Sequence, residues 1–332
     1  MSAPMPLRLV IVGCSLAGLR AAQAARREGF EGSVVLVGRE EHLPYDRPPL
    51  SKGFLVDDHA EATFFVGADD LAALDVDVRL GVSATGLDAA AKSVITGQKR
   101  TGYDKLIIAT GGDARLLAPG QLWTSGSGDD RPLVEVLRTL DDARSLRDRV
   151  RPSARIVVVG AGFIGSEIAS SARSLSASVV LVEAANVPLV RALGPVVGDA
   201  VSRLHERFGT ELLAGVQVEG IAAVGDERRV TLSSGQVLDA DVVVAGIGAV
   251  PATGWIGSAL DLHPLMAVCS ATSTCAPRIR TCMPAAMWSI GPTSSSAKRC
   301  ASRTARRQRV WCPRALRTSE IHTRAYGGTG SP

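Results

Sequence analysis

Runs of consecutive apolar residues recur along most of the chain, each ended by glycine or by polar residues. Such runs are typical of strands that are buried on both faces of a sheet. The runs lie at 9–12, 33–38, 106–109, 156–159, 178–182 and 241–247. A glycine-rich turn and a helical pattern follow the first and the fourth run, so the order strand, turn, helix, strand occurs twice. This order predicts an α/β protein.

Weaker patterns fill the intervals between these runs. Alternating apolar and polar residues predict small β-meanders near 82–96 and 216–237. Residues 134–150 have the apolar spacing of an amphipathic helix that is rich in paired charges. These patterns bear on the fold rather than on function.

The turn after the first run resembles a dinucleotide-binding motif. Gly13, Ser15 and Gly18 occupy the three glycine positions of a dinucleotide fingerprint, with the small residue Ala17 between them. Small residues are needed there because a cofactor pyrophosphate reaches the free N–H groups of the helix start only if no side chain intervenes. With serine in the second position, this copy alone is equally typical of an ordinary turn between a strand and a helix.

The turn after the fourth run is a second and complete copy. Gly160, Gly162 and Gly165 are all in place, and Phe163 and Ile164 lie between the last two glycines. Two copies in one chain make coincidence a poor explanation. We therefore expect two nucleotide sites and a fold of two Rossmann-like, three-layer dinucleotide-binding domains (ββα/βαβ).

An acidic residue follows the second strand of each copy. These residues are Glu40 and Glu183, each about 20 residues past the last glycine, where a carboxylate can accept both hydroxyls of an adenosine ribose. A carboxylate would also repel a 2′-phosphate, so Glu183 favours NADH over NADPH. Arg191 lies nearby and is the reason to keep NADPH as the less favoured alternative.

Length and composition agree with a well-buried α/β core in about two domains. The chain has 332 residues, of which 46% are hydrophobic and 21% charged. It has no apolar run long enough to span a membrane and no recognisable leader sequence, so we expect a cytoplasmic protein. The net charge of +4 hides two unlike parts. Residues 1–263 carry 26 Lys and Arg against 32 Asp and Glu, whereas residues 264–332 carry 11 against one.

The segment after the first strand–helix–strand unit holds two cations on a rigid loop. Pro44, Pro48 and Pro49 keep this loop extended, and they place Arg47 and Lys52 on it. From the residues alone, a solvated surface loop is the usual interpretation of such a segment.

Four motifs in order resemble the FAD-dependent ferredoxin reductases, which are similar also to rubredoxin and putidaredoxin reductases and belong to the pyridine nucleotide-disulfide oxidoreductase superfamily. The motifs read IVGCSLAG, PYDRPPLSK, YDKLIIATG and VVVGAGFIGSE. The resemblance covers about residues 7–263. It implies FAD and NADH as cofactors, and a ferredoxin-type iron–sulfur protein as the partner that receives the electrons in an oxygenase system. It gives no reason to expect nucleic acid or a membrane as a partner.

The resemblance also assigns roles to individual residues. It implies that Arg47 and Lys52 lie beside the FAD, with Lys52 close to the reactive edge of the flavin. It implies that Glu167 pairs with Lys52 near the nicotinamide, so that these two residues are the catalytic candidates. Glu167 is predicted in the first turn of the second fingerprint's helix, where attraction to the helix dipole is the alternative explanation of its charge.

The ATG turn after the third run is expected to close over the FAD. It consists of Ala109, Thr110 and Gly111, and without the resemblance it could be a plain turn at the end of a strand. Arg115 matches the arginine that follows this turn in the family. Gly248 follows the last apolar run, where the family's chain returns to the FAD domain.

The resemblance implies that the NAD domain is inserted into the FAD domain. Residues 1–113 would form the first part of the FAD domain, 114–238 the NAD(P) domain, and 239–263 the return segment of the FAD domain. The remaining residues, 264–332, form an aberrant basic tail that is expected to lack regular structure. The C-terminal interface domain of the family is therefore missing or scrambled.

The tail is best explained by a lost reading frame. Residues 281–288 must be encoded by codons that, read two nucleotides later, permit Val-Tyr-Ala-Gly-Gly-Asp-Val, which matches the family's missing VYAAGDV motif. We infer, as a hypothesis, that the frame was lost near residues 263–266. A nucleic-acid-binding tail is the weaker explanation, since no regular basic face is evident. The five cysteines of the tail form no CxxC pair, and we assign no metal site.

Two functional alternatives remain open. A related NADH oxidase or a nitrite-reductase-type flavoprotein would share both domains without needing a ferredoxin. From a different class, the chain could be a non-catalytic remnant that binds NAD but not FAD.

Overall fold

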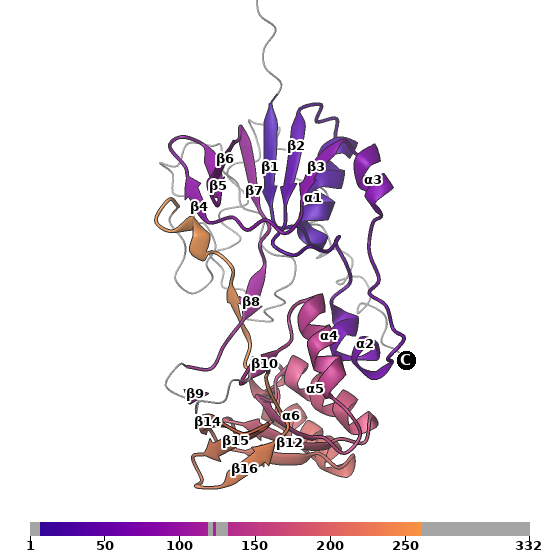
Figure 1. The fold of residues 1–332 in the computed structure, drawn as a ribbon, viewed down its shortest axis with the longest axis vertical. Coiled ribbons are helices and arrows are strands. Elements are labelled where there is room, and N and C mark those ends of the chain that lie inside the picture. The colour runs from indigo at the N-terminus through magenta and orange to yellow at the C-terminus, as the bar shows by residue number, and fades with distance from the viewer. Residues whose placement is uncertain (1–6, 119–121, 124–131, 261–332) are drawn as a thin grey trace, which may run out of the picture.

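The computed structural model describes residues 7–118, 122–123 and 132–260. They form two α/β units stacked along the long axis of the molecule, joined by a narrow connection (Figure 1). This confirms the predicted fold class. The predicted properties of residues 264–332 lie outside the described residues.

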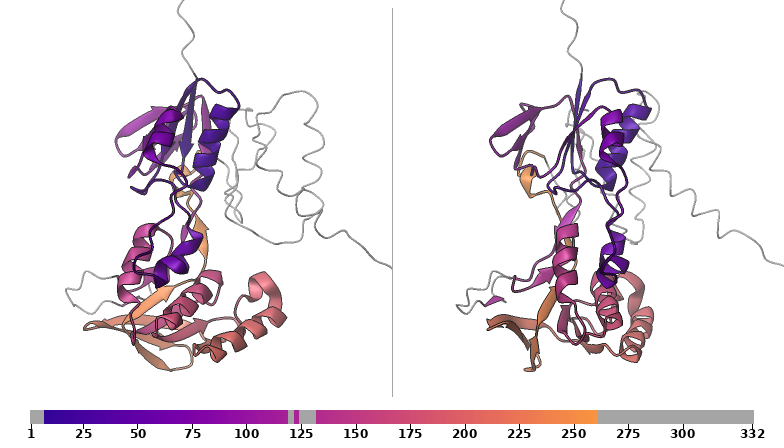
Figure 2. Two further views of the ribbon diagram at one scale, coloured as in Figure 1. Left: turned by 90° about the vertical axis from the view of Figure 1, so that its right-hand side faces the viewer. Right: turned by 45° about the vertical axis from the view of Figure 1, so that its right-hand side comes forward.

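The first unit is a three-layer sandwich built on a parallel sheet of order β3-β2-β1-β7. Helix α1 packs on one face, and a three-stranded antiparallel sheet lies on the other (Figure 2). Alternate residues of β1 face the two layers, and all of them from Leu9 to Val12 are buried, which is why the sequence shows a continuous apolar run. The elements are β1 (Arg8–Val12), α1 (Leu16–Arg27), β2 (Ser33–Val37), α3 (Ala68–Ala73), β3 (Val76–Arg79), β4 (Gly86–Asp88), β5 (Ser93–Thr96), β6 (Lys99–Gly102) and β7 (Lys105–Ile108).

The second unit repeats this plan around a parallel sheet of order β10-β17-β11-β12-β13. Helix α5 packs on one face, and the sheet β16-β15-β14-β9 packs on the other. The elements are β9 (Leu122–Trp123), β10 (Glu135–Val136), α4 (Leu140–Arg149), β11 (Arg155–Val159), α5 (Phe163–Ser174), β12 (Ser178–Glu183), α6 (Val190–Arg207), β13 (Glu211–Ala214), β14 (Val218–Val224), β15 (Glu227–Leu232), β16 (Val237–Ala240) and β17 (Val242–Ala245).

Two predicted boundaries differ from the structure. The helix expected over 134–150 is interrupted, because 135–136 form strand β10 and α4 begins only after Thr139, which caps it together with Asp142. The return segment expected from residue 239 begins later, since β17 pairs with β11 and so belongs to the second sheet. The crossing between the units is made by β8 (Gly112–Ala114) and β18 (Ala249–Pro251), which pair antiparallel.

Residues beyond the crossing return to the first unit. The short helix η3 (Gly254–Ile256) buries Ile256 against the same face of the first sheet as β4 and β5. The first unit is therefore built from two separate stretches of the chain, with the second unit between them.

The proline-rich segment leaves the first unit and packs on the second. Its short helices η1 (Pro48–Ser51) and α2 (Gly53–Val56) lie beside α4 and α5 (Figure 1). Leu55 belongs to the core beneath α5, and Tyr45, Leu50 and Phe54 form a cluster with Leu140 of α4. This segment therefore fastens the two units together beside the crossing strands.

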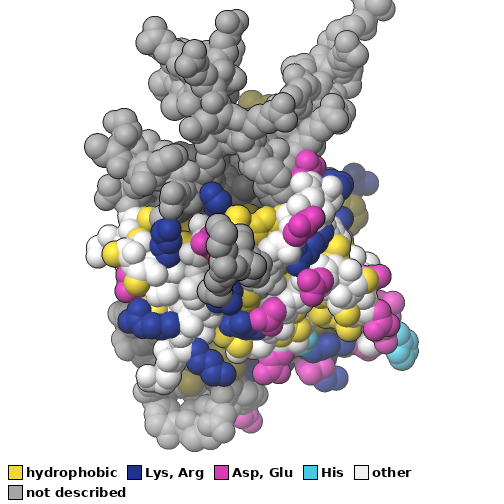
Figure 3. Space-filling view, turned by 90° about the horizontal axis from the view of Figure 1, so that it is seen from above, with side chains coloured by type: hydrophobic (Ala, Val, Ile, Leu, Met, Phe, Trp, Pro, Cys, Tyr) yellow, Lys and Arg dark blue, Asp and Glu magenta, His cyan; other side chains and the backbone are white. Residues whose placement is uncertain are grey.

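On the face of the first unit seen in Figure 3, basic and acidic side chains are interspersed. No helix among the described residues is long and apolar enough to cross a membrane.

Candidate functional site

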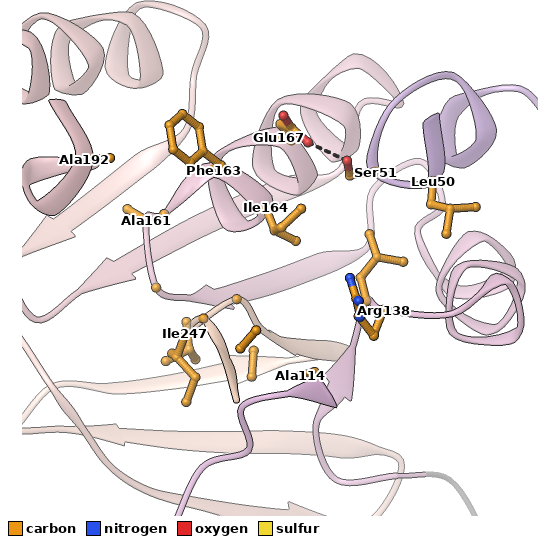
Figure 4. Close-up of a pocket in the computed structure, with 18 of the residues that line it drawn as sticks. Leu50, Ser51, Ala114, Arg138, Ala161, Phe163, Ile164, Glu167, Ala192 and Ile247 are labelled. Carbon is orange, nitrogen blue, oxygen red and sulfur yellow. Dashed lines mark hydrogen bonds between the residues drawn. The ribbon is translucent and has the colours of Figure 1, made fainter. Parts of the chain in front are cut away.

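A large cavity lies between the two units and has a volume of about 1000 Å³. Residues from both glycine-rich turns, the proline-rich segment and the crossing strands line it. Figure 4 labels Ala161 of the second turn, Ser51 of the proline-rich segment and Ala114 of the crossing strands. The sequence-predicted residues that line it are Ser15, Ala17, Arg47, Lys52, Ala109, Thr110, Gly111, Gly160, Gly162, Phe163, Ile164, Glu167, Glu183 and Gly248. The fold therefore brings most of the predicted site residues into one space.

The first glycine turn presents backbone to this cavity. A Cβ atom on Gly13 would lie 2.1 Å from the Ala109 carbonyl oxygen, and one on Gly18 would lie 1.8 Å from the carbonyl oxygen of Gly13. These two glycines therefore face protein backbone, and they let β1, β7 and α1 approach closely. Ser15 precedes α1 and makes no capping bond with its side chain, which leaves the first N–H groups of the helix available to an anion.

The second glycine turn repeats this geometry. A Cβ atom on Gly160 would lie 2.8 Å from the Gly246 carbonyl oxygen, and one on Gly165 would lie 1.9 Å from the carbonyl oxygen of Gly160. Phe163 and Ile164 begin α5 with more than 40% of their surface exposed, and Figure 4 shows them at the cavity. Exposed apolar side chains at a helix start suit contact with a flat ring.

Lys52 and Glu167 form an ion pair across the two units. The Nζ atom of Lys52 lies 2.8 Å from Oε2 of Glu167, and the hydroxyl of Ser51 donates to the same oxygen over 2.5 Å (Figure 4). Glu167 is the fifth residue of α5 rather than part of its first turn, so the dipole explanation of its charge is wrong. The carboxylate is instead held by two donors from the proline-rich segment.

Glu183 ends β12 beside the second glycine turn. Its carboxylate accepts the backbone N–H of Ala161 over 2.6 Å and that of Ala185 over 2.8 Å. Each carboxylate oxygen has further lone pairs, so the group can still accept ribose hydroxyls. Arg191 also lines the cavity, on the first turn of α6.

Tyr45, Ser51 and Arg138 are among the cavity residues that were not predicted from the sequence. Arg138 donates from Nε to the Gly112 carbonyl over 2.6 Å. Burial and the neighbouring charge of Arg47 lower the pKa of Arg138 below its ordinary value. Tyr45 and Ser51 belong to the PYDRPPLSK motif, so the motif could have identified them as site residues. Arg138 belongs to no motif, and its sequence position is notable only because it precedes a helix cap.

Five predicted residues do not line the cavity. Gly13, Gly18 and Gly165 face protein backbone in the two turns, as described above. Arg115 is exposed, although its backbone N–H donates to Gly248. Glu40 is turned toward Tyr45 and Arg47, which both donate to its carboxylate.

Among the described residues, no group of three or more His, Cys, Asp or Glu is placed to hold a metal ion. Cys14 is a free thiol in the first glycine turn. Burial, with a contribution from Glu40, raises its pKa to about 11, so it is a poor nucleophile at neutral pH.

Two dinucleotide-type turns facing one cavity define a two-nucleotide oxidoreductase architecture. The chain belongs to the pyridine nucleotide-disulphide oxidoreductase family, whose model matches residues 7–264. The match ends where the resemblance in the sequence also ends.

The curated proteins that the chain resembles include ferredoxin–NAD(+) reductases and a putidaredoxin reductase. The chain is 36% identical over 249 residues to the ferredoxin–NAD(+) reductase subunit of the benzene 1,2-dioxygenase system of Pseudomonas putida, covering 75% of this chain and 59% of that protein. It is 35% identical to putidaredoxin reductase CamA of Pseudomonas putida, covering 73% and 58%. The chain thus spans less than two thirds of the length of these relatives.

Solved structures also match this chain. A covalent putidaredoxin reductase–putidaredoxin complex matches with a TM-score of 0.73 and 32% identity, covering 84% of this chain and 67% of that chain. A water-forming NADH oxidase from Lactobacillus brevis matches with a TM-score of 0.70 at 21% identity, covering 79% and 58%, which shows a common fold.

Proposed function

We propose that the protein is an NADH-dependent flavoprotein reductase that binds FAD in the first unit and NADH in the second. Electrons then pass to a ferredoxin-type iron–sulfur protein of an oxygenase system. The observation that carries the proposal is the cavity that both glycine turns share, with the Lys52–Glu167 ion pair in its lining. The similarity to a reductase subunit of a dioxygenase system and to a putidaredoxin reductase supports the same function.

The residues present fit two dinucleotides. At each turn a Cβ atom on the first or the last glycine would clash with a backbone carbonyl, so glycine lets strand and helix approach as closely as a dinucleotide turn requires. Each turn precedes a helix of 12 residues without a side-chain cap among the described residues. The N–H groups at these helix starts would bind the pyrophosphates. We propose that the FAD is bound by residues 1–113 and by a return segment that ends at 263 and begins after β17 rather than at residue 239. The residues from 114 through β17 would then bind the NADH.

Charged residues would then orient the two rings. When bound, the flavin supplies hydride acceptance from the nicotinamide and single-electron release to an iron–sulfur acceptor. The Lys52 ammonium holds the Glu167 carboxylate, and Ser51 fixes the same oxygen. Glu183 would accept the adenosine ribose hydroxyls of NADH and disfavour a 2′-phosphate. Phe163 and Ile164 would exclude water from one side of the cavity.

The partner and the location follow from the same proposal. Relatives named for ferredoxin, and the structure of a reductase with putidaredoxin, support a small iron–sulfur protein as the acceptor. We propose that the protein works in the cytoplasm, where NADH is available.

The acceptor is tested by reconstituting the chain with FAD and following NADH-driven reduction of cytochrome c. We expect reduction that depends strictly on an added ferredoxin. Equal NADH consumption without ferredoxin, with oxygen as the acceptor, would favour an oxidase instead.

A further inference from the structure

The two glycine turns can be compared residue by residue because their hydrogen bonds are equivalent. In the second unit, the N–H of Gly160 donates to Val182 over 2.7 Å, at the end of β12. The next residue, Glu183, therefore stands beside Ala161 and accepts its N–H. An acidic residue at this position can accept hydrogen bonds from the hydroxyls of a ribose.

In the first unit, the N–H of Gly13 donates to Val37 over the same 2.7 Å, at the end of β2. The residue equivalent to Glu183 is therefore Gly38. A Cβ atom on Gly38 would lie 2.4 Å from the Cβ of Cys14, so the Cys14 side chain fills the space beside it. The described first unit thus carries no carboxylate at this position, and Glu40 lies two residues farther along the chain.

The carboxylate of Glu40 has other partners. It accepts the hydroxyl of Tyr45 on Oε2 and the guanidinium of Arg47 on Oε1, each over 2.5 Å, and its side chain is only 18% exposed. Both partners also form hydrogen bonds with the second unit. The hydroxyl of Tyr45 accepts the N–H of Leu140 over 2.8 Å, and Arg47 donates to the carbonyl of Arg138 over 2.5 Å.

We propose that Glu40 is a positioning residue that holds Arg47 at the cavity and ties the first unit to the start of α4, and that it does not bind a ribose. Charge-assisted bonds to two donors make a part-buried carboxylate a strong anchor. The inference deepens the proposed function, since it rests on the first unit taking the FAD.

The first test follows Tyr45 and needs no cofactor. Burial and the bond from Tyr45 to Glu40 raise the pKa of this tyrosine, while Arg47, 5.1 Å from its ring, opposes them. His42 meets the same ring edge-on. Tyr103→Phe and Tyr326→Phe leave Tyr45 as the single tyrosine, whose ring Cζ can be followed by carbon-13 NMR from neutral to alkaline pH.

In that background, Glu40→Gln should shift the Tyr45 signal at neutral pH and let the hydroxyl ionise at lower pH. The matched control is Glu41→Gln, which removes the same charge from the exposed neighbouring residue and should leave the titration unchanged. An unchanged Tyr45 titration in Glu40→Gln would overturn the anchor.

The second test separates anchoring from ribose binding. We measure affinity for FAD and for an analogue whose adenosine carries 2′-deoxyribose. Because Glu40 anchors Arg47, Glu40→Gln should weaken the affinity for both ligands by the same factor, roughly threefold to tenfold. The affinities of Glu41→Gln should stay within about twofold of those of the original chain. Loss of FAD affinity without loss of analogue affinity would make Glu40 a ribose ligand. A chain that binds neither ligand refutes the proposed function, while the Tyr45 titration still decides the role of Glu40.

Discussion

At the scale of residues, the glycines were predictable and the residues that join the units were not. Gly13 and Gly160 follow from backbone physics, because each lies where another carbonyl leaves no room for a side chain. The Lys52–Glu167 pair joins residues 115 positions apart, so it followed only from the family resemblance. Arg138 reaches the cavity through tertiary packing, which no local pattern encodes.

Lys52 and Glu167 should act as a unit. Lys52→Gln and Glu167→Gln are each expected to slow flavin reduction by NADH roughly tenfold, because a hydrogen bond between charged groups contributes about 1.5–3 kcal/mol. The double variant should be no slower than the worse single variant. Anaerobic stopped-flow absorbance measures the rates, with Lys99→Gln on the exposed strand β6 as the control for charge. Fully additive losses would show that the pair does not act together.

Glu183 should decide between the two nicotinamide cofactors. Glu183→Ala removes the ribose acceptor and the bonds to Ala161 and Ala185, so NADH affinity should fall roughly tenfold. NADPH affinity should fall less, because the repulsion of its 2′-phosphate disappears as well. Calorimetric titration of both cofactors checks this, with Glu211→Ala on β13 as the control. Equal losses for both would place Glu183 away from the 2′-position.

At the scale of elements, prediction succeeded wherever a strand is buried on both faces. The apolar runs at 9–12 and 156–159 became β1 and β11, since each of these positions packs on one layer or the other. Prediction failed at 134–150, where one amphipathic pattern covers both a short strand and a helix. The Thr139 and Asp142 capping pair marks the true helix start and was readable in the sequence.

The first glycine turn should tolerate no side chain at Gly13. Gly13 has φ +117° and no room for a Cβ, so Gly13→Ala should lower the free energy of unfolding by about 3 kcal/mol or more. Gly97 also has positive φ, +60°, but stands in open space, and Gly97→Ala should cost only about 1–2 kcal/mol. Urea unfolding measures both. Similar losses would mean that backbone strain alone, and not close packing, requires glycine at position 13.

At the scale of the whole molecule, the sequence predicted two units and an insertion but not how the units are fastened. The proline-rich segment packs its apolar residues on α4 and α5, and Arg147 of α4 lies over the ring of Phe54. Neither contact is visible in a linear pattern, because the partners are far apart in the chain. The segment that carries Arg47 and Lys52 is therefore placed by the second unit as much as by the first.

The length of the chain bears on the central claim. The family match ends at residue 264, close to the place where the frame-loss hypothesis puts the break. The match covers 59% of the benzene 1,2-dioxygenase reductase subunit. Whether the first 263 residues suffice for FAD binding and hydride transfer is therefore the question that most directly tests the proposed function.

The visible absorption spectrum of the purified chain, incubated with FAD and freed of excess, answers this question. We predict a bound flavin band that is bleached when NADH is added without oxygen, because both glycine turns and the Lys52–Glu167 pair are present. A colourless protein that still binds NADH would contradict the account, and would leave a nicotinamide-binding protein without reductase activity.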